Sequence, residues 1–417
     1  MYKFFLLIIS LLIFFSCSED PHQLILNVYD KEIPGVVKDT TLLVVSDTTR
    51  FHTSRVNTQF SLRLGFGSVD TLECRPIIRF TDYSTIPDSA QIDSAWIYLD
   101  GNNSISNGNV SPITARLHPI LGSWKTNLDE VWNDYTQNID RNTLLAELQI
   151  SPDDTNNYTF TLNDAGLELA RTWADTATSP DENFGLIIDF DQANFIQYFS
   201  AINSGGDPVL FLQYSLPSDT AVYRDTLLAN YDAFLYKGGF PRESDRNYSS
   251  SLIEYHTTLD FDFSSFLAAY NNEVTILSAN LQLPVDLNHS LIDPLYDISN
   301  IVVLKLDTLN LDSLVADSST GLFARLNNWS DDSSYIEIGT NDNRTTLSTM
   351  IRQKLSTGKK TASYIISVID DASNKSSRVS HEKEQFCYLS FFTYKDPDLL
   401  KRARLQIEYW VPAKPRI

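Results

Sequence analysis

Short runs in which apolar and polar residues alternate recur along most of this chain. Phe60, Leu62 and Leu64 alternate with polar residues, and Tyr158 to Leu162 has the same period of two. Since successive side chains of a strand point to opposite faces, this period is typical of a strand with one buried face. Further strand-like runs cover residues 76–80, 92–99, 113–119, 185–190 and 208–216. The pattern predicts an all-β protein.

Two short helices interrupt the strands. Asn163 or Asp164 can cap a helix that continues through Ala170 to Trp173. Apolar residues at helical spacing from Leu347 to Leu355 predict its counterpart in the second half of the chain.

The second half repeats the order of elements in the first. Ile276 to Leu283 mirrors Ile92 to Leu99, and strand-like runs ending at Pro217 and Pro412 close the two halves. We interpret this as an internal duplication with a boundary near residues 217–224. The alternative is coincidence, because many β-sandwiches have similarly spaced strands.

Many short strands with few helices predict two tandem antiparallel β-sandwich domains of jelly-roll-like type, each with one or two short helices. The expected divisions are a signal peptide over residues 1–16 and a tether over 17–40. The first sandwich is expected over residues 41–217 and the second, a diverged repeat, over 218–417.

The N-terminus carries an export signal. Lys3 precedes an apolar run from Phe4 to Phe15, which is too short to span a bilayer and is followed by Ser16 and Cys17. This end resembles a bacterial lipoprotein cleavage box, which implies lipid attachment at Cys17. The acidic start Ser18-Glu19-Asp20 after this cysteine resembles a surface-export signal and implies an outer-membrane lipoprotein exposed at the cell surface. The alternative is a secreted protein in which Cys17 has no such role.

Composition limits the partners. The chain has 417 residues, 42% of them hydrophobic, and a formal net charge of −21. A chain this acidic repels phosphates, so we expect no nucleic-acid partner. Anionic lipid would repel it as well, so membrane contact is expected only through the lipid anchor.

The three cysteines leave one question open. If Cys17 is lipidated, Cys74 and Cys387 remain, one in each half. They can form a disulfide in an oxidising compartment, or both can be buried thiols, which the packing of free cysteine favours. No CxxC pair is present, so no thiolate metal site is expected.

No catalytic motif appears. The six histidines are scattered, and the chain has no HExxH, GxSxG, Walker or GxGxxG pattern. Acidic pairs such as Asp153-Asp154 are expected in solvated loops, given 53 acidic residues. We therefore expect no catalytic residue, metal or cofactor.

The first half resembles the DNRLRE-type domain of secreted bacterial proteins. The resemblance covers residues 48–217 and rests on motif order. The motifs are Ser61-Leu62-Arg63-Leu64-Gly65, Arg75-Pro76-Ile77-Ile78-Arg79-Phe80, Ile92 to Leu99, Gly122-Ser123-Trp124, Val131-Trp132-Asn133 and Asn183 to Ile188. The family implies a β-sandwich module of the cell surface, in some members a carbohydrate-binding one. The second half lacks both Trp motifs, so the resemblance does not extend a binding function to it.

Aromatic residues are the candidate ligand-binding residues. Trp124, Trp132 and Tyr135 lie in a polar segment that reads as a long loop, where exposed rings can stack on sugars. Alternatively, both tryptophans plug the end of the sandwich, since large rings are usually buried. Trp96, Trp173 and Trp410 are expected in the core.

Three functions remain. The first is a non-catalytic surface lipoprotein that binds a polysaccharide. The second is a structural or adhesion subunit that binds another surface protein, which requires an exposed apolar patch. The third is a polysaccharide-degrading enzyme, which requires converging carboxylates.

Overall fold

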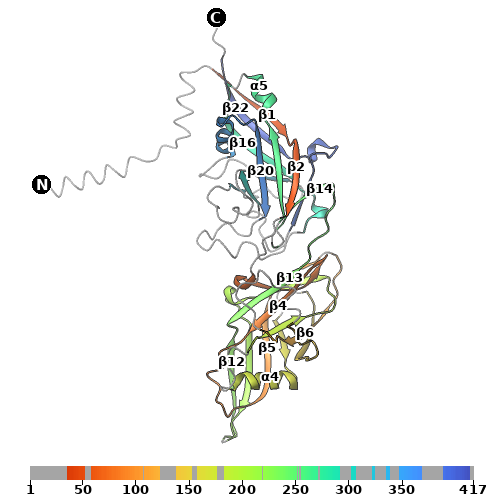
Figure 1. Ribbon diagram of the computed structural model, residues 1–417, viewed down its shortest axis with the longest axis vertical. Coiled ribbons are helices and arrows are strands. Elements are labelled where there is room, and N and C mark those ends of the chain that lie inside the picture. Colours follow the sequence, from red (N-terminus) through yellow and green to blue (C-terminus); the bar gives the residue numbers. More distant parts are fainter. Residues whose placement is uncertain are drawn as a thin grey trace, which may run out of the picture.

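The computed structural model describes residues 35–51, 58–106, 108–122, 138–152, 157–175, 183–217, 219–250, 252, 255–270, 273–291, 302–306, 322–324, 335–338, 347–368 and 388–413. Here the chain is all-β, as predicted, and its strands pair antiparallel in sheets that pack as two sandwiches. Figure 1 shows the two sandwiches joined end to end, the first at the bottom of the view.

The first sandwich consists of two sheets that share one long strand. One sheet contains β12 (Val222–Leu228), β11 (Val209–Ser215), the first half of β5 (Gln91–Ser106) and β8 (Asn157–Thr161). The other contains the second half of β5 with β10 (Phe195–Ser200), β3 (Arg63–Val69), β4 (Leu72–Arg79), β9 (Leu186–Asp189), β6 (Ile113–Pro119), β7 (Ala146–Ile150) and β13 (Tyr231–Lys237).

A bulge in β5 sets which of its side chains face the core. Ile92 and Ala95 are both buried although they are three residues apart. Asp93 between them is an extra residue in the ladder with β11, because Tyr214 pairs with Ile92 while Gln213 pairs with Ser94. Such a bulge shifts the alternation by one position, so the apolar residues on both sides of it reach the same core.

The second sandwich has the same plan. One sheet contains β1 (Gly35–Leu43), β22 (Arg404–Pro412), β16 (Thr275–Pro284) and β19 (Tyr335–Ile338). The other contains β18 (Leu322–Ala324), β17 (Val302–Leu306), β20 (Thr361–Val368), β15 (Tyr255–Asp262), β14 (Arg246–Ser250), β21 (Tyr388–Phe392) and β2 (Ser46–Phe51).

The strand pairings of the two sandwiches correspond, except that the β5–β10 ladder of the first is matched in the second only by the isolated bridge between Val285 and Phe391. The β5–β11 ladder matches the β16–β22 ladder, and Leu277 forms the same bulge that Asp93 forms in the first sandwich. The aligned inner residues Ile97 and Leu281 are both fully buried. This agreement in pairing, bulge and core supports the predicted internal duplication.

The helices lie where the sequence placed them. In α4 (Asp164–Ala174), the cap Asn163 accepts a hydrogen bond from the backbone N–H of Gly166, and Ala170 is buried in the first core. In the second sandwich, α6 (Leu347–Ser356) buries Met350 and Ile351, and α5 (Ser264–Ala269) is a shorter additional helix.

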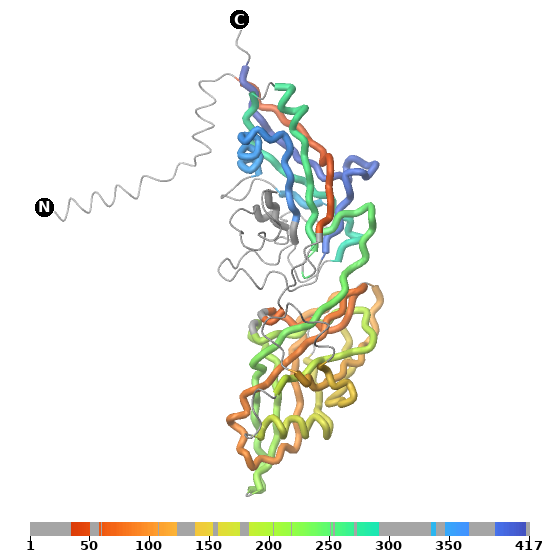
Figure 2. Tube along the Cα trace, viewed as in Figure 1, coloured from red at the N-terminus to blue at the C-terminus, as the bar shows by residue number. Residues whose placement is uncertain are grey.

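Each sandwich is completed by two strands from the opposite repeat. The N-terminal arm (β1 and β2, residues 35–51) pairs with β22 and β15 of the second sandwich. The equivalent internal arm (β12 and β13, residues 222–237) pairs with β11 and β4 of the first. Figure 2 shows the red N-terminal arm running among the green and blue strands of the second sandwich. The two repeats have thus exchanged their first two strands.

Equivalent hydrogen bonds hold each arm at the point between its two strands, where the chain bends. The backbone N–H of Val44 donates to the carbonyl of Ala403 at 3.0 Å, and that of Ala229 donates to the carbonyl of Pro208 at 2.9 Å. Val44 and Ala229 are both buried. Each arm therefore crosses from one sheet to the other at a small apolar residue. The side chain of that residue is part of the core of the sandwich that the arm completes.

The exchange changes the predicted domain borders. The expected tether, residues 17–40, overlaps β1, which begins at Gly35. Residues 41–51 belong to the second sandwich and residues 222–237 to the first, contrary to the predicted spans 41–217 and 218–417. The predicted boundary near 217–224 separates the repeats in sequence, but the exchanged arms move the border of the folded sandwiches to the segment after β13.

An aromatic cluster joins the sandwiches end to end. The ring of Phe240, in the segment after β13, stacks on Tyr388 of β21 with centroids 4.1 Å apart and an interplanar angle of 6°. The Tyr388 hydroxyl donates to Asp70 of the first sandwich at 3.2 Å. Leu72 and Ile196 from the first sandwich and Tyr248 from the second belong to the same buried cluster.

Cys74 is a buried free thiol in this cluster, and burial raises the pKa of its thiol. Its possible partner, Cys387, lies outside the described residues. For Cys74 the structure agrees with the buried-thiol alternative.

Candidate functional site

The predicted ligand residues Trp124, Trp132 and Tyr135 lie outside the described residues, as does the predicted lipid site Cys17. The structure does describe the two ends between which the aromatic segment runs. Ile120 and Ile139 form an antiparallel bridge, and the backbone N–H of Leu121 donates to Asn138 at 2.7 Å. The ends of residues 121–138 are therefore held together on the first sandwich, and we call this bridge the loop root.

The loop root rests on an apolar patch on the outer face of the sheet. Ile120 and Ile139 pack with Ile77 of β4 and Ile187 of β9, all of them buried. Leu235 from the internal arm belongs to the same cluster. The exchanged strand therefore contributes to the surface that supports the loop root.

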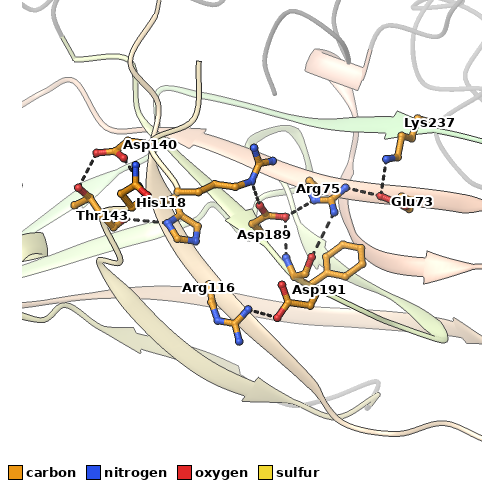
Figure 3. Close-up of polar contacts among 12 residues, drawn as sticks. Glu73, Arg75, Arg116, His118, Asp140, Thr143, Asp189, Asp191 and Lys237 are labelled. Atoms are coloured by element: carbon orange, nitrogen blue, oxygen red, sulfur yellow. Dashed lines mark hydrogen bonds and ion pairs between the residues drawn. The ribbon is translucent and has the colours of Figure 1, made fainter. Parts of the chain in front are cut away.

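A row of charged side chains continues from this patch along β4 and β9, where Arg75 and Asp189 lie two residues from Ile77 and Ile187. Figure 3 shows the contacts of this row. Arg75 of β4 donates to Asp189 of β9 and, through Nη1, to Glu73 at 2.7 Å. Arg141 donates to the other Asp189 oxygen at 2.9 Å, and Lys237 of the internal arm lies 3.1 Å from Glu73. These residues, which we call the charged row, link three strands and the segment after the loop root.

The charged row holds its carboxylates in the ionised form. Burial acts to raise the pKa of Asp189, but the charge of Arg75 and the hydrogen bonds from Arg75, Arg141 and the Phe190 N–H outweigh it, so the pKa lies below its usual value. The same balance, with Arg75 and Lys237, lowers the pKa of Glu73. A carboxylate with a lowered pKa and its oxygens bonded to guanidinium groups is a poor proton acceptor, so this row is suited to structure and not to acid–base chemistry.

Two smaller groups extend the polar surface. Arg116 bridges Asp191 at 2.5 Å and Glu147 at 3.0 Å, and these carboxylates are largely exposed. His118 places Nδ1 2.9 Å from the carbonyl oxygen of Thr143, whose hydroxyl donates to Asp140 at 2.6 Å (Figure 3). The hydrogen bond from Thr143 lowers the pKa of Asp140.

The remaining tryptophans do not all follow the prediction. Trp96 was expected in the core, but it is half-buried on the outer face of the β11–β5 sheet. Trp173 packs against the edge of the first core beside Tyr83, with centroids 6.3 Å apart. Trp410 is half-buried near the end of β22. Trp96 and Ile97 are successive residues of β5, so the alternation of the strand puts their side chains on opposite faces of the sheet. This alternation, rather than the size of the ring, determined that Trp96 lies on the outer face.

Within the ranges described above, no group of three or more His, Cys, Asp or Glu residues is arranged to hold a metal ion. None of the helices in those ranges is long and apolar enough to cross a bilayer. Comparison with models of known protein families and with curated protein sequences gives no match for this chain.

Proposed function

We propose that this protein is an exported, lipid-anchored and non-catalytic binding protein that presents its first sandwich to a polysaccharide at the cell surface. One observation carries the proposal. The start of β1 and the end of β22 pair at Gly35 and Pro412, at the end of the second sandwich farthest from the first (Figure 1). An anchor at Cys17, upstream of β1, would therefore hold the second sandwich nearest the membrane and the first outermost.

The connection between the sandwiches supports this role. A buried aromatic cluster joins them, including the Phe240–Tyr388 stack. Buried aromatic packing of this kind resists bending between domains more than a polar linker does. The first sandwich, with the loop root and its aromatic segment, is then held at the outer end of a stiff stalk.

The ligand class follows from the residues of that segment. Trp124, Trp132 and Tyr135 follow the loop root among polar neighbours, a composition suited to stacking on sugar rings and bonding to their hydroxyl groups. The net charge of −21 disfavours an acidic ligand. We therefore favour a neutral polysaccharide.

The lipid anchor and the exposure of the chain at the cell surface are tested in cells. An alkyne fatty acid should label the parental chain and not the Cys17→Ser variant. Cysteines introduced at exposed positions, Asp93 in the first sandwich and Lys359 in the second, should react with a membrane-impermeant maleimide on intact cells, with the parental chain as background. Absence of fatty-acid labelling, or labelling of neither cysteine before lysis, would contradict the proposal.

Binding is tested with the chain that lacks its first 21 residues, which retains every described residue. Native gels cast with β-glucan, mannan or pullulan should retard it, whereas gels with alginate or pectate should not. If no polysaccharide retards the protein, the glycan function fails and protein partners become the alternative.

A further inference from the structure

An aromatic face covers part of the outer surface of the first sandwich, on the sheet opposite the loop root. It consists of Trp96 and Tyr98 of β5 and Phe211 of β11. The rings of Trp96 and Phe211 are nearly parallel, at 20° with centroids 5.5 Å apart, and Tyr98 lies edge-on to Phe211 at 6.5 Å. All three side chains are half-buried, so each contacts its neighbours and solvent.

The two cross-strand rows that hold these rings are neutral, while the flanking rows of the same face carry Asp100 and Arg224. Two cross-strand rows run over β8, β5, β11 and β12 at this place. Their members are Thr159, Tyr98, Val209 and Leu228 in one row and Thr161, Trp96, Phe211 and Thr226 in the other. None of these eight residues is charged, in a chain whose formal net charge is −21. The face therefore offers rings and threonine hydroxyl groups, and no carboxylate within either row.

The second sandwich provides an internal comparison. The positions equivalent to Trp96 and Phe211 are Asn280 and Gln406, which also pair directly across β16 and β22. In place of Tyr98 stands Gln282, which accepts a hydrogen bond from Arg404 at 2.6 Å and donates one to Glu337. The second copy thus carries a charged and hydrogen-bonded polar ladder where the first copy carries rings.

The inner face of the same strands did not diverge in this way. Ile97 and Leu210 of the first sandwich match Leu281 and Leu405 of the second, and all four are buried. The sandwich therefore needs apolar residues on its inner face and accommodates polar ones on its outer face. Because the fold does not require the three outer rings, their presence in one copy points to a ligand.

The size of the face argues for a glycan rather than a protein. A whole aromatic side chain has about 150–250 Å² of surface, so the three half-buried rings and Leu228, which is 53% exposed in the same row, expose on the order of 300 Å² together. A stable protein interface needs about 800 Å² from each partner. A single polysaccharide chain lying across the strands needs much less, and its neutral rings suit a face of aromatic groups and hydroxyls.

We infer that Trp96, Tyr98 and Phe211 form a glycan-binding platform that takes a neutral polysaccharide chain across β5 and β11. This inference rests on the proposed function and specifies a site for it that is separate from residues 123–137. The apolar C–H faces of the sugars pack on the rings, while Thr159, Thr161 and Thr226 bond to sugar hydroxyl groups.

The test transfers the residues of the second copy to the first. The double variant Trp96→Asn/Phe211→Gln introduces the side chains that the equivalent positions already hold, so the sandwich should fold. The variant Trp124→Ala/Trp132→Ala removes the loop rings instead, and Tyr231→Ser removes an exposed ring that lies elsewhere. All are compared with the parental chain in gels with β-glucan, mannan and pullulan, after circular dichroism and thermal unfolding confirm the fold.

We expect the platform variant to bind about tenfold or more weakly, a loss typical of removing aromatic anchors from a binding surface, while Tyr231→Ser binds normally. If the platform variant binds like the parental chain and the loop variant loses binding, the platform is overturned and the proposed function stands. If the parental chain binds none of these polysaccharides, both fail.

Fluorescence gives a second measurement at the platform itself. A bound sugar that covers Trp96 should shift or quench part of the tryptophan emission of the parental chain. The single variant Trp96→Asn should lack that part of the change. A change of equal size in both proteins would place the ligand elsewhere and overturn the inference.

Discussion

Asp47 and Asp232 stand at the same position of two equivalent strands, and each accepts a backbone hydrogen bond from the other repeat. Asp47 of the N-terminal arm accepts from Tyr394, just after β21, and Asp232 of the internal arm accepts from Ile202, just after β10. Both carboxyls have a raised pKa, chiefly because they are buried. The matched pair shows that the two arms dock in the same way on opposite partners.

The first prediction concerns the pH dependence of stability. Burial, with a contribution from Asp207, raises the pKa of Asp232 from 3.8 to about 7 in the folded protein. The folded state therefore keeps a proton that the unfolded state releases, and the stabilisation, complete below pH 4, is lost as the pH rises toward 7. Asp232→Asn keeps a side-chain acceptor for the Ile202 N–H and should flatten this dependence, measured as the free energy of unfolding in urea at pH 5 and pH 8.

The exposed Asp93→Asn is the control for this experiment, since it removes a carboxylate from a solvated bulge of the same sandwich. It should leave the parental pH dependence in place. An Asp232→Asn variant that loses as much stability between pH 5 and pH 8 as the parental chain would show that Asp232 does not carry this proton.

The second prediction follows from the exchange of arms. Val44 precedes the first sandwich in sequence but is buried in the core of the second. Val44→Ala should destabilise the second sandwich by about 1–3 kcal/mol, through lost apolar burial and the cavity left behind. Hydrogen exchange should therefore quicken more in β15 and β22 than in β3 and β4.

The neighbouring Val45 is 49% exposed, so Val45→Ala is a matched control and should change exchange in neither sandwich. Faster exchange confined to the first sandwich in Val44→Ala would mean that the N-terminal arm docks there instead.

The third prediction concerns the joint between the sandwiches. Phe240→Ala removes the ring that stacks on Tyr388 and should cost about 3–5 kcal/mol. Calorimetry should then resolve two unfolding transitions in place of one, because the sandwiches lose their shared cluster. Tyr388→Phe keeps the stack and removes only the hydrogen bond to Asp70, so it should cost about 1 kcal/mol and leave one transition. A single transition in Phe240→Ala would show that other contacts couple the sandwiches.

The fourth prediction concerns the charged row. Arg75→Met leaves the buried Asp189 without its principal partner and should cost about 3–5 kcal/mol at pH 7. In the parental chain the lowered pKa of Asp189 contributes stability that is present above its unfolded pKa and lost as the pH falls. The variant removes this contribution, so the difference between variant and parent should shrink as the pH falls below 3.8, the usual pKa of the group.

Arg116→Met serves as the comparison, because the carboxylates that Arg116 contacts are largely exposed. It should cost no more than about 1 kcal/mol at any pH. Equal losses in the two arginine variants would mean that the charged row is a solvated surface network without a structural role.

Much of the architecture could be predicted from local pattern. The period-two runs predicted many of the strands, though not β12 and β13 of the internal arm. The Asn163 cap and the helical spacing after Leu347 predicted two helices, and the similarity of Ile92–Leu99 to Ile276–Leu283 predicted the duplication. These features depend on neighbouring residues, so a sequence shows them directly. The sequence also contains a signal for the arms. Thr41-Leu42-Leu43 is followed by Asp47 as Thr226-Leu227-Leu228 is followed by Asp232, which marks the two arms as copies.

The sequence by itself thus determined many of the strands with their inner and outer faces, two helices and the repeat. Only the tertiary structure decided which sandwich each arm completes. The two docking sites are equivalent, and a strand pairs through backbone groups that every residue carries, so local sequence does not choose between them. The same holds for the charged row and the aromatic face, whose members Arg75 and Asp189, or Trp96 and Phe211, lie more than a hundred residues apart and meet only through strand register.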